Sequence, residues 1–508
     1  MLLAVVAAVR RVHALPTDGL WFDDAWVAVG ALHGTSSQIA VRGSAHPGFT
    51  LLLQAWNALT HSAPNGLAVP ALVAGSLGPP LVYLGLRRLR FAMPIACILA
   101  SVLVVADIHA LYSGRVKSYT FDTAGIMVLA AVLPSVAARR WGWRSAARWV
   151  VASLVVSSLS GYLLVGTALA IGILALHPNG DRRVRSVALL VQAAGQVSMY
   201  LAARRTTDLD AVERFMETTY DGHLSLYRNP LRMAGQLLAH LGRIVDVYTG
   251  GPVWVLAPLG IVALWALGAS AVGWPNRDRI VTSRYLLLCV AFALIGGLLN
   301  RFPFGPDTRN WIAALNSPGG RHSLWLVPVF VVGFALALEA IRTALTARSR
   351  LTVPIDLVMV AAAIALMGAA WQPTPRYMED HSLSAARYTD RVAGPDGLVI
   401  AIGPPAYQYA SATDREITLL ATPENMVGFS PVGAGGRLVA VGEWATLPYD
   451  APTVRRLVGS EERVVLAGSF LGPGASNLAV DTLKAEGFQV TEQFWEQNSL
   501  VVVLERSA

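Results

Sequence analysis

Long apolar segments recur along this 508-residue chain up to about residue 371, and none follows. Apolar residues make up 54% of the sequence and charged residues only 14%, whereas a soluble globular protein carries about 25% charged residues. An apolar segment of about 17–25 residues crosses a bilayer as a helix. The sequence therefore predicts a polytopic α-helical membrane protein and excludes a soluble enzyme, a disordered chain and a coiled coil.

Eleven apolar segments are candidate spans, although the first and the two on either side of residue 160 are short for a bilayer. A further apolar stretch, residues 47–60, is predicted to lie at the interface as a juxtamembrane helix. The first segment is not expected to be a signal peptide, because Arg10 and Arg11 follow its apolar run. The predicted spans are residues 2–16, 67–87, 92–108, 120–138, 146–160, 161–177, 186–203, 251–271, 280–299, 322–345 and 354–371.

Arginines gather in five of the short connections between these spans, and basic residues in such connections favour the cytoplasmic side. If residues 47–60 do not cross the membrane, all five clusters lie inside; if they cross, all five lie outside. We therefore predict that the N-terminus is inside and the C-terminal part outside. The clusters are Arg87, Arg88 and Arg90; Arg139, Arg140, Arg144 and Arg148; Arg182, Arg183 and Arg185; Arg277, Arg279 and Arg284; and Arg342, Arg348 and Arg350.

The formal charge of +8 divides between two parts of opposite sign. Residues 1–375 carry 30 basic and 16 acidic side chains, a net of +14, and residues 376–508 carry 10 and 16, a net of −6. The later part alternates strand and helix patterns, with apolar strand runs that begin at residues 398, 437, 463 and 499. This alternation predicts a small α/β extracytoplasmic domain after a transmembrane domain. Because the positive charge is explained by membrane orientation, it does not indicate a nucleic-acid partner.

The first outward loop places two acids, Asp23 and Asp24, next to the membrane among aromatic residues. Burial near apolar rings raises the pKa of a carboxyl group, and a neighbouring acid raises it further. A base of this kind can take a proton from a hydroxyl group. The alternative interpretation is that an Asp caps the helix that follows.

The second outward loop, residues 109–119, collects positive charge where topology disfavours it. Arg115 and Lys117 lie there between Tyr112 and Tyr119, and Lys117 is one of only two lysines in the chain. Arginine binds a phosphate through two hydrogen bonds, and lysine binds it as a point charge. The loop therefore predicts a binding site for a lipid-linked phosphate; the alternative is that these side chains reach up to lipid headgroups.

Two further outward segments lie later in the membrane part. Residues 300–321 add positive charge through Arg301, Arg309 and Arg321, next to His322. Residues 204–250 carry both signs of charge and are expected to form an amphipathic helix or lid. The ten histidines and two cysteines show no metal-ligand spacing, so no metal motif is predicted.

Taken in order, these motifs resemble one family. The order is an acidic pair after the first span, a His-Pro helix start, a Y-S-x-x-x-K-x-Y loop and a late P-F-G segment followed by an arginine. It resembles the GT-C superfamily of glycosyltransferases that use polyprenyl-phosphate sugars. Among these it is most similar to the bacterial proteins allied to protein O-mannosyltransferases and lipid A aminoarabinose transferases. The resemblance covers roughly residues 1–371.

The resemblance implies roles for particular residues. Asp23 would be the catalytic base, and Asp24 would hold the acceptor or the base. His46 and Arg301 would position the substrate, although Gly48 replaces the second proline of the family's His-Pro-Pro motif. The residues implied to hold the donor phosphate are Tyr112, Arg115, Lys117, Tyr119 and Arg321.

The implied reaction is an inverting sugar transfer from a polyprenyl-phosphate donor to an acceptor hydroxyl, on the outer face of the bacterial cytoplasmic membrane. Some superfamily members use a divalent metal, and Mg²⁺ or Mn²⁺ at Asp23 and Asp24 is compatible with the sequence but not required by it. The partners would be the lipid-linked sugar, membrane lipid and a glycan, lipid or protein acceptor. Two other functions compatible with the composition are a transporter or flippase of a lipid-linked sugar and a non-catalytic membrane scaffold.

Overall fold

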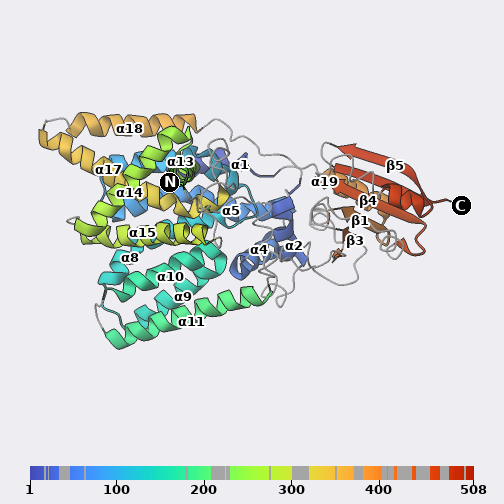
Figure 1. Cartoon of the computed structure of the whole chain (residues 1–508), viewed down its shortest axis with the longest axis horizontal. Helices are drawn as coiled ribbons and strands as arrows, with labels where there is room; N and C mark the ends of the chain where they lie inside the picture. The colour runs from blue at the N-terminus through green and yellow to red at the C-terminus, as the bar shows by residue number, and fades with distance from the viewer. Residues whose placement is uncertain are drawn as a thin grey trace. The chain divides into compact units, whose positions relative to one another are not determined.

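The computed structural model divides the chain into two compact units (Figure 1). The first unit contains residues 1–15, 69–201 and 213–376, and the second contains residues 16–68, 202–212 and 377–508. The structure describes all residues except 17–18, 21, 34–45, 62–63, 178–180, 207–223, 225–228, 274–275, 300–319, 349–351, 371–381, 403–408, 410–416, 420–437, 442–457, 470–479, 497–498 and 508.

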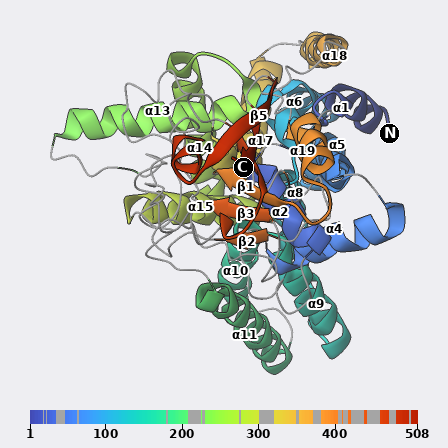
Figure 2. The ribbon, with the colours of Figure 1, turned by 90° about the vertical axis from the view of Figure 1, so that its right-hand side faces the viewer.

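The first unit is helical, and each of the eleven apolar segments predicted as a span coincides with a helix. Its α1, α5 and α6 lie side by side (Figure 2). The helices wholly or mostly in this unit are α1 (Leu2–Val12), α5 (Val69–Arg88), α6 (Met93–Val105), α7 (Asp107–Ser113), α8 (Tyr119–Ala138), α9 (Trp143–Leu159), α10 (Gly161–Ala175), α11 (Arg182–Thr206), α13 (Pro230–Thr249), α14 (Val253–Gly273), α15 (Arg277–Leu298), η2 (Arg321–Leu326), α17 (Val327–Arg348) and α18 (Thr352–Ala369).

Fewer helices satisfy both the length and the apolarity of a membrane span than the eleven predicted. Among the described residues five do, and a sixth is obtained if the bent pair α6 and α7 is one span. The helices α10 and α18 are apolar but shorter. The five are Asn65–Arg88, Tyr119–Ala138, Val253–Gly273, Arg277–Leu298 and Arg321–Ala347. The count of eleven spans therefore stays a prediction.

Two arginines of α1 stabilise the break between α6 and α7, where the chain bends by 62°. The last four carbonyl groups of a helix have no partner within it. Arg11, which is fully buried, donates to the carbonyl oxygen of Leu103 at 2.8 Å. Arg10 donates to the carbonyl oxygen of Val105 at 3.3 Å and forms an ion pair with Asp107. These two side chains thus supply donors that the broken helix lacks.

The second unit contains the acidic helix α2 (Phe22–His33), the helix α4 (Pro47–Thr60) and the short helix η1 (Pro64–Ala68). Pro47 is the first residue of α4, where its fixed φ angle suits a helix start and its missing N–H leaves no donor unpaired. Helix α4 covers the same residues as the predicted juxtamembrane helix, and it packs against α2.

The C-terminal residues of the second unit form a mixed six-stranded sheet with the order β2-β3-β1-β4-β6-β5. Strands β2, β3, β1 and β4 are parallel, and β6 is antiparallel to both β4 and β5. One face of the sheet packs against α19, where Ala385 and Ala386 are buried against Val399 and Val465. The elements are α19 (Ser382–Ala393), β1 (Leu398–Ile402), β2 (Ile417–Leu419), β3 (Leu438–Val441), β4 (Arg463–Ser469), β5 (Phe488–Glu496) and β6 (Ser499–Arg506).

Candidate functional site

The acidic pair lies on α2, in the second unit. This helix begins at Phe22, so Asp23 and Asp24 both lie inside its first turn. A capping residue would instead precede the first turn. Acids in a first turn are favoured by the helix dipole. The carboxyl group of Asp24 is buried, with the residue only 1% exposed, beside the buried Ala25 and Ala28. The side chain of Asp23 lies outside the described part of the chain.

His46 lies immediately before α4, the helix that packs on α2. Its backbone is extended, and Phe49 and Leu53, in the next turns of α4, are fully buried. Burial lowers the pKa of the His46 imidazole to about 4. The ring is therefore neutral at physiological pH, and it contributes hydrogen-bonding atoms rather than charge.

This shift predicts a loss of stability in acid. Because the pKa of His46 lies below that of an exposed histidine, the unfolded chain binds the extra proton as the pH falls from about 6.5 towards 4. We expect the unfolding midpoint of the detergent-solubilised protein to fall between pH 7.5 and pH 5, and to fall less in His46→Asn. His61→Asn, which changes an exposed histidine at the other end of α4, is the control. Equal acid sensitivity of His46→Asn and wild type would contradict the prediction.

The basic loop lies in the first unit, between α7 and α8. Tyr112 is the next-to-last residue of α7 and Tyr119 is the first residue of α8, and their rings meet edge to face with centroids 5.4 Å apart. Arg115, between them, is 7% exposed, and Lys117 is half-buried. The contact between Tyr112 and Tyr119 joins the two ends of the loop, so Arg115 and Lys117 lie near the start of α8.

The glycine of this loop, Gly114, is required by the packing around it. A Cβ atom at Gly114 would lie 1.9 Å from the carbonyl oxygen of Ala14. No side chain fits at that distance, so the close approach of the segment after α1 requires glycine here.

His322, which follows the predicted outward segment 300–321, contacts the tyrosines of the basic loop and of α10. The ring of His322 lies 5.9 Å from that of Tyr119, edge to face. Its Nδ1 is 2.7 Å from the hydroxyl oxygen of Tyr162, and Arg321 Nε donates to its Nε2 at 3.4 Å. Since Nε of arginine only donates, Nε2 accepts, and a neutral imidazole then donates from Nδ1 to Tyr162. The result is a connected group of Tyr112, Tyr119, Tyr162, Arg321 and His322, called below the basic-aromatic cluster.

Helix η2 is fixed in place by contacts to α8 and α10. Thr123, in the second turn of α8, donates to the carbonyl oxygen of Leu324 at 2.8 Å. Trp325 is buried and stacks on Tyr162, with ring centroids 5.7 Å apart. Arg321 therefore starts a turn whose backbone and aromatic side chain are both anchored.

Helix α7 is anchored by α1. Arg11 Nε donates to the hydroxyl oxygen of Ser113 at 3.2 Å, and the same guanidinium lies 3.0 Å from Nδ1 of His109. The hydroxyl of Ser113 donates to the carbonyl oxygen of His109 at 2.7 Å. Arg11 thus fixes the end of the helix that carries Tyr112.

The structure brings together some of the predicted site residues. Tyr112, Tyr119 and Arg321 meet in one cluster, on the same loop as Arg115 and Lys117. Asp24 and His46 lie on or next to two helices that pack together, in the other unit. Arg301 lies outside the described residues. Tyr162, which the sequence analysis did not single out, follows Ser160 at the break between α9 and α10, and that break was the available signal.

The described residues do not form a recognisable metal centre. No group of three or more histidine, cysteine, aspartate or glutamate side chains converges among them. The side chain of Asp23 lies outside the described residues. Binding of Mg²⁺ or Mn²⁺ at Asp23 and Asp24 therefore stays a prediction.

No family model matches the chain, and no curated protein matches it significantly in sequence. Solved structures do. ArnT from Cupriavidus metallidurans bound to undecaprenyl phosphate is similar over 99% of this chain and 97% of its own, with a TM-score of 0.57 and 11% identity. The apo form of the same protein gives a TM-score of 0.55 and 12% identity, with the same coverage of both chains.

At this low identity the similarity concerns the fold. The chain shares the fold of ArnT, in line with the fold that its sequence resemblance led us to expect. Together with the long apolar helices, this similarity makes the chain a mostly helical integral membrane protein with an ArnT-like fold.

Proposed function

We propose that the chain is an inverting glycosyltransferase that moves a sugar from a polyprenyl-phosphate donor to an acceptor hydroxyl on the outer face of the bacterial cytoplasmic membrane. The observation that carries this proposal is the basic-aromatic cluster, which places Arg321 beside the Arg115–Lys117 loop in a fold shared with ArnT. The similar ArnT structure is bound to undecaprenyl phosphate, which belongs to the class of lipid phosphate that the proposed reaction releases.

The cluster supports the leaving-group side of the reaction. When the bond between the anomeric carbon and the phosphate oxygen breaks, the electron pair stays on the phosphate and its negative charge grows. Arg115, Lys117 and Arg321 would stabilise that charge, because preorganised cations in a partly buried site act most strongly on developing charge. The tyrosine hydroxyl groups and His322 would orient the cations and the phosphate.

The acidic helix supports the other side of the reaction. The acceptor oxygen attacks the anomeric carbon from the face opposite the phosphate, and Asp23 takes the hydroxyl proton. The products are the glycosylated acceptor and the free polyprenyl phosphate. Asp24 and the neutral His46 would hold Asp23 or the acceptor in place.

The positions of the acids in the membrane part disfavour a transporter, which would place unbalanced ionisable groups at the middle of the bilayer. Asp122 lies in the first turn of α8, and Asp356 lies in the first turns of α18. The carboxylate of Asp356 accepts two hydrogen bonds from Arg342, at 2.8 and 2.9 Å. Both of these acids thus lie near a helix end.

The proposal is tested with membranes that contain the full chain and are supplied with radiolabelled polyprenyl-phosphate sugars. We expect label to move from the lipid to a second molecule, and glycan analysis of a deletion strain should identify the sugar and whether the acceptor is a glycan, a lipid or a protein. Movement of labelled lipid across the bilayer without formation of a glycosylated product would support the flippase and overturn the proposal.

The proposed orientation has eleven spans, a cytoplasmic N-terminus and an outer C-terminal domain from residue 376 onward. A cysteine that replaces the exposed Ser507 should react with an impermeant maleimide in intact cells. A cysteine that replaces Arg144, in the predicted inner cluster, should react only after the membrane is opened. Protection of the C-terminal cysteine in intact cells would contradict this orientation.

A further inference from the structure

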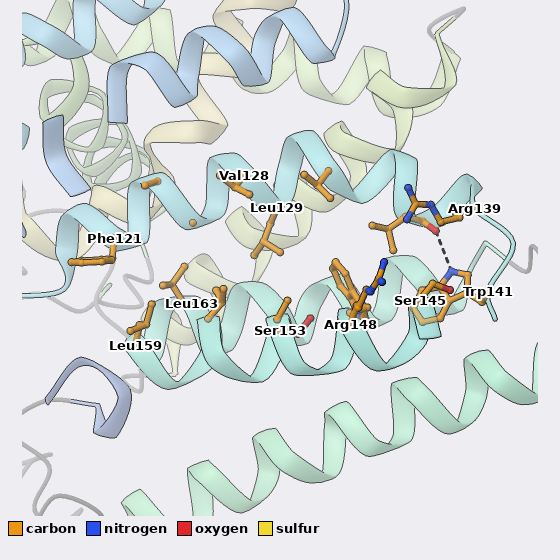
Figure 3. A pocket seen from close by; sticks show the side chains of 17 residues that line it. Phe121, Val128, Leu129, Arg139, Trp141, Ser145, Arg148, Ser153, Leu159 and Leu163 are labelled. Carbon is orange, nitrogen blue, oxygen red and sulfur yellow. Dashed lines mark hydrogen bonds between the residues drawn. The ribbon is translucent and has the colours of Figure 1, made fainter. Parts of the chain in front are cut away.

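A cavity of about 480 Å³ lies between α8 and α9 (Figure 3). Phe121, Leu159 and Leu163 line one end, and Val128 and Leu129 line the middle. A cavity of this size between transmembrane helices, with almost entirely apolar walls, is suited to a hydrocarbon chain.

The other end of the cavity is basic and aromatic. Arg139 and Arg148 line it, and they are the charged members of its wall. Figure 3 shows Arg148 reaching from α9 into the space between the two helices, with Arg139 at the end of α8. The indole of Trp141, also in the wall, is fixed by a hydrogen bond from Nε1 to the carbonyl oxygen of Val136 at 3.1 Å.

A third arginine lies behind this end. Arg185 of α11 is 4% exposed, and its guanidinium carbon lies 6.0 Å from the centre of the Trp141 ring. Within the described part of the chain, neither of its terminal nitrogens has a hydrogen-bond acceptor. A buried cation without an acceptor is costly, so an anion bound at this end of the cavity would be favourable.

We propose that the cavity binds one anionic phospholipid of the cytoplasmic leaflet. Its phosphate lies between Arg139 and Arg148, in the field of Arg185, and one acyl chain lies along the apolar wall. Arg139, Arg148 and Arg185 belong to two of the clusters predicted to face the cytoplasm, where anionic lipids make the membrane surface negative. Arginine suits this role because its planar fork binds phosphate oxygens through two hydrogen bonds.

This site is separate from the one proposed for the donor phosphate. The basic-aromatic cluster is at the Tyr119 end of α8, and Arg139 follows the last residue of that helix. Twenty residues of helix correspond to about 30 Å, which is the thickness of the hydrocarbon core. One phosphate group cannot occupy both ends.

The test measures lipid retention by the purified full chain in mild detergent, by native mass spectrometry with dioleoyl-phosphatidylglycerol and dioleoyl-phosphatidylcholine. We expect retention of the anionic lipid to exceed that of the zwitterionic lipid and to fall about tenfold in the double variant Arg139→Gln/Arg148→Gln. Arg140→Gln/Arg144→Gln removes the same charge from exposed side chains of the same connection that do not line the cavity, and it should retain the lipid.

A second variant tests the apolar wall without changing charge. Ala152→Trp would fill the cavity between α8 and α9 and should lower phosphatidylglycerol retention while all three arginines remain. Size-exclusion profiles and unfolding midpoints show which variants are folded. If Arg139→Gln/Arg148→Gln and Arg140→Gln/Arg144→Gln lose phosphatidylglycerol retention equally, the effect is one of general surface charge. That result would overturn the proposal. Displacement of phosphatidylglycerol by undecaprenyl phosphate would assign the cavity to the donor and would also overturn it.

Discussion

Replacement of Asp23 by asparagine should lower the turnover number of sugar transfer by about 100-fold or more, because a positioned general base contributes about 10²–10⁴ to the rate. The amide has nearly the same shape as the carboxyl group but cannot accept the hydroxyl proton. Retention of the polyprenyl-phosphate donor should be unchanged, since the donor phosphate is proposed to bind at the basic-aromatic cluster. The measurement is the initial rate of label transfer at saturating donor, together with the donor KM.

Three comparisons make this result specific to Asp23. Asp23→Glu keeps a carboxyl group and should recover part of the turnover. The pH profile of the wild type should rise as the base loses its proton, and Asp23→Asn should lack this rise. Asp24→Asn changes the buried side chain proposed to hold Asp23 or the acceptor, so it should lower turnover less than Asp23→Asn and should also lower the unfolding midpoint. Transfer at the wild-type rate by Asp23→Asn, or loss of turnover only in Asp24→Asn with the fold intact, would show that Asp23 is not the base.

The helices were the most predictable part of the fold. Each apolar segment that was predicted as a span coincides with a helix, because length and apolarity depend only on local sequence. The amphipathic α13 also falls within the segment for which such a helix was expected. The break between α6 and α7 was not predicted, because it depends on Arg10 and Arg11. Their partners in α6 and α7 are more than 90 residues away along the chain.

The strands likewise divide into those that the local sequence predicts and those that it does not. β1, β3, β4 and β6 were predicted from their apolar runs. β2 and β5 were not, because β2 has only three residues and β5, the edge strand next to β6, carries polar and charged side chains. Edge strands commonly carry such residues, since these discourage pairing with other chains.

In the candidate site, the sequence indicates the cations of the basic loop but not the side chains that the structure places around them. Tyr112 and Tyr119 flank the basic loop in the sequence, so their pairing could be expected. The link from Tyr162 to His322 joins residues 160 positions apart, and no spacing in the chain indicates it. Arg11 was interpreted only as a flanking charge of the first span, whereas in the structure it holds the helix that carries Tyr112.

Substitution of Arg321 by glutamine should lower the turnover number by about 10²–10³, the cost of removing one preorganised donor from a developing oxyanion. The structural reason is that Arg321 begins an anchored turn and is oriented by His322, whose other ring nitrogen contacts Tyr162. Glutamine can still donate a hydrogen bond but carries no charge. Arg321→Lys keeps the charge but loses the planar guanidinium that donates two parallel hydrogen bonds. Its turnover number should therefore lie between those of Arg321→Gln and wild type.

The kinetic signature separates transition-state stabilisation from simple donor binding. If Arg321 acts on the charge that grows on the leaving phosphate, kcat and kcat/KM fall together in Arg321→Gln; if it only binds the donor, KM rises while kcat stays unchanged.

Tyr162→Phe leaves the arginine in place and removes one hydrogen bond to His322, so its effect should be smaller and in the same direction. Arg243→Gln removes another basic residue from a predicted outward segment, one that is paired with Asp246 at 3.0 Å, and it should leave kcat unchanged. A rise in KM alone in Arg321→Gln would place this arginine in donor capture and leave Arg115 and Lys117 to stabilise the leaving group.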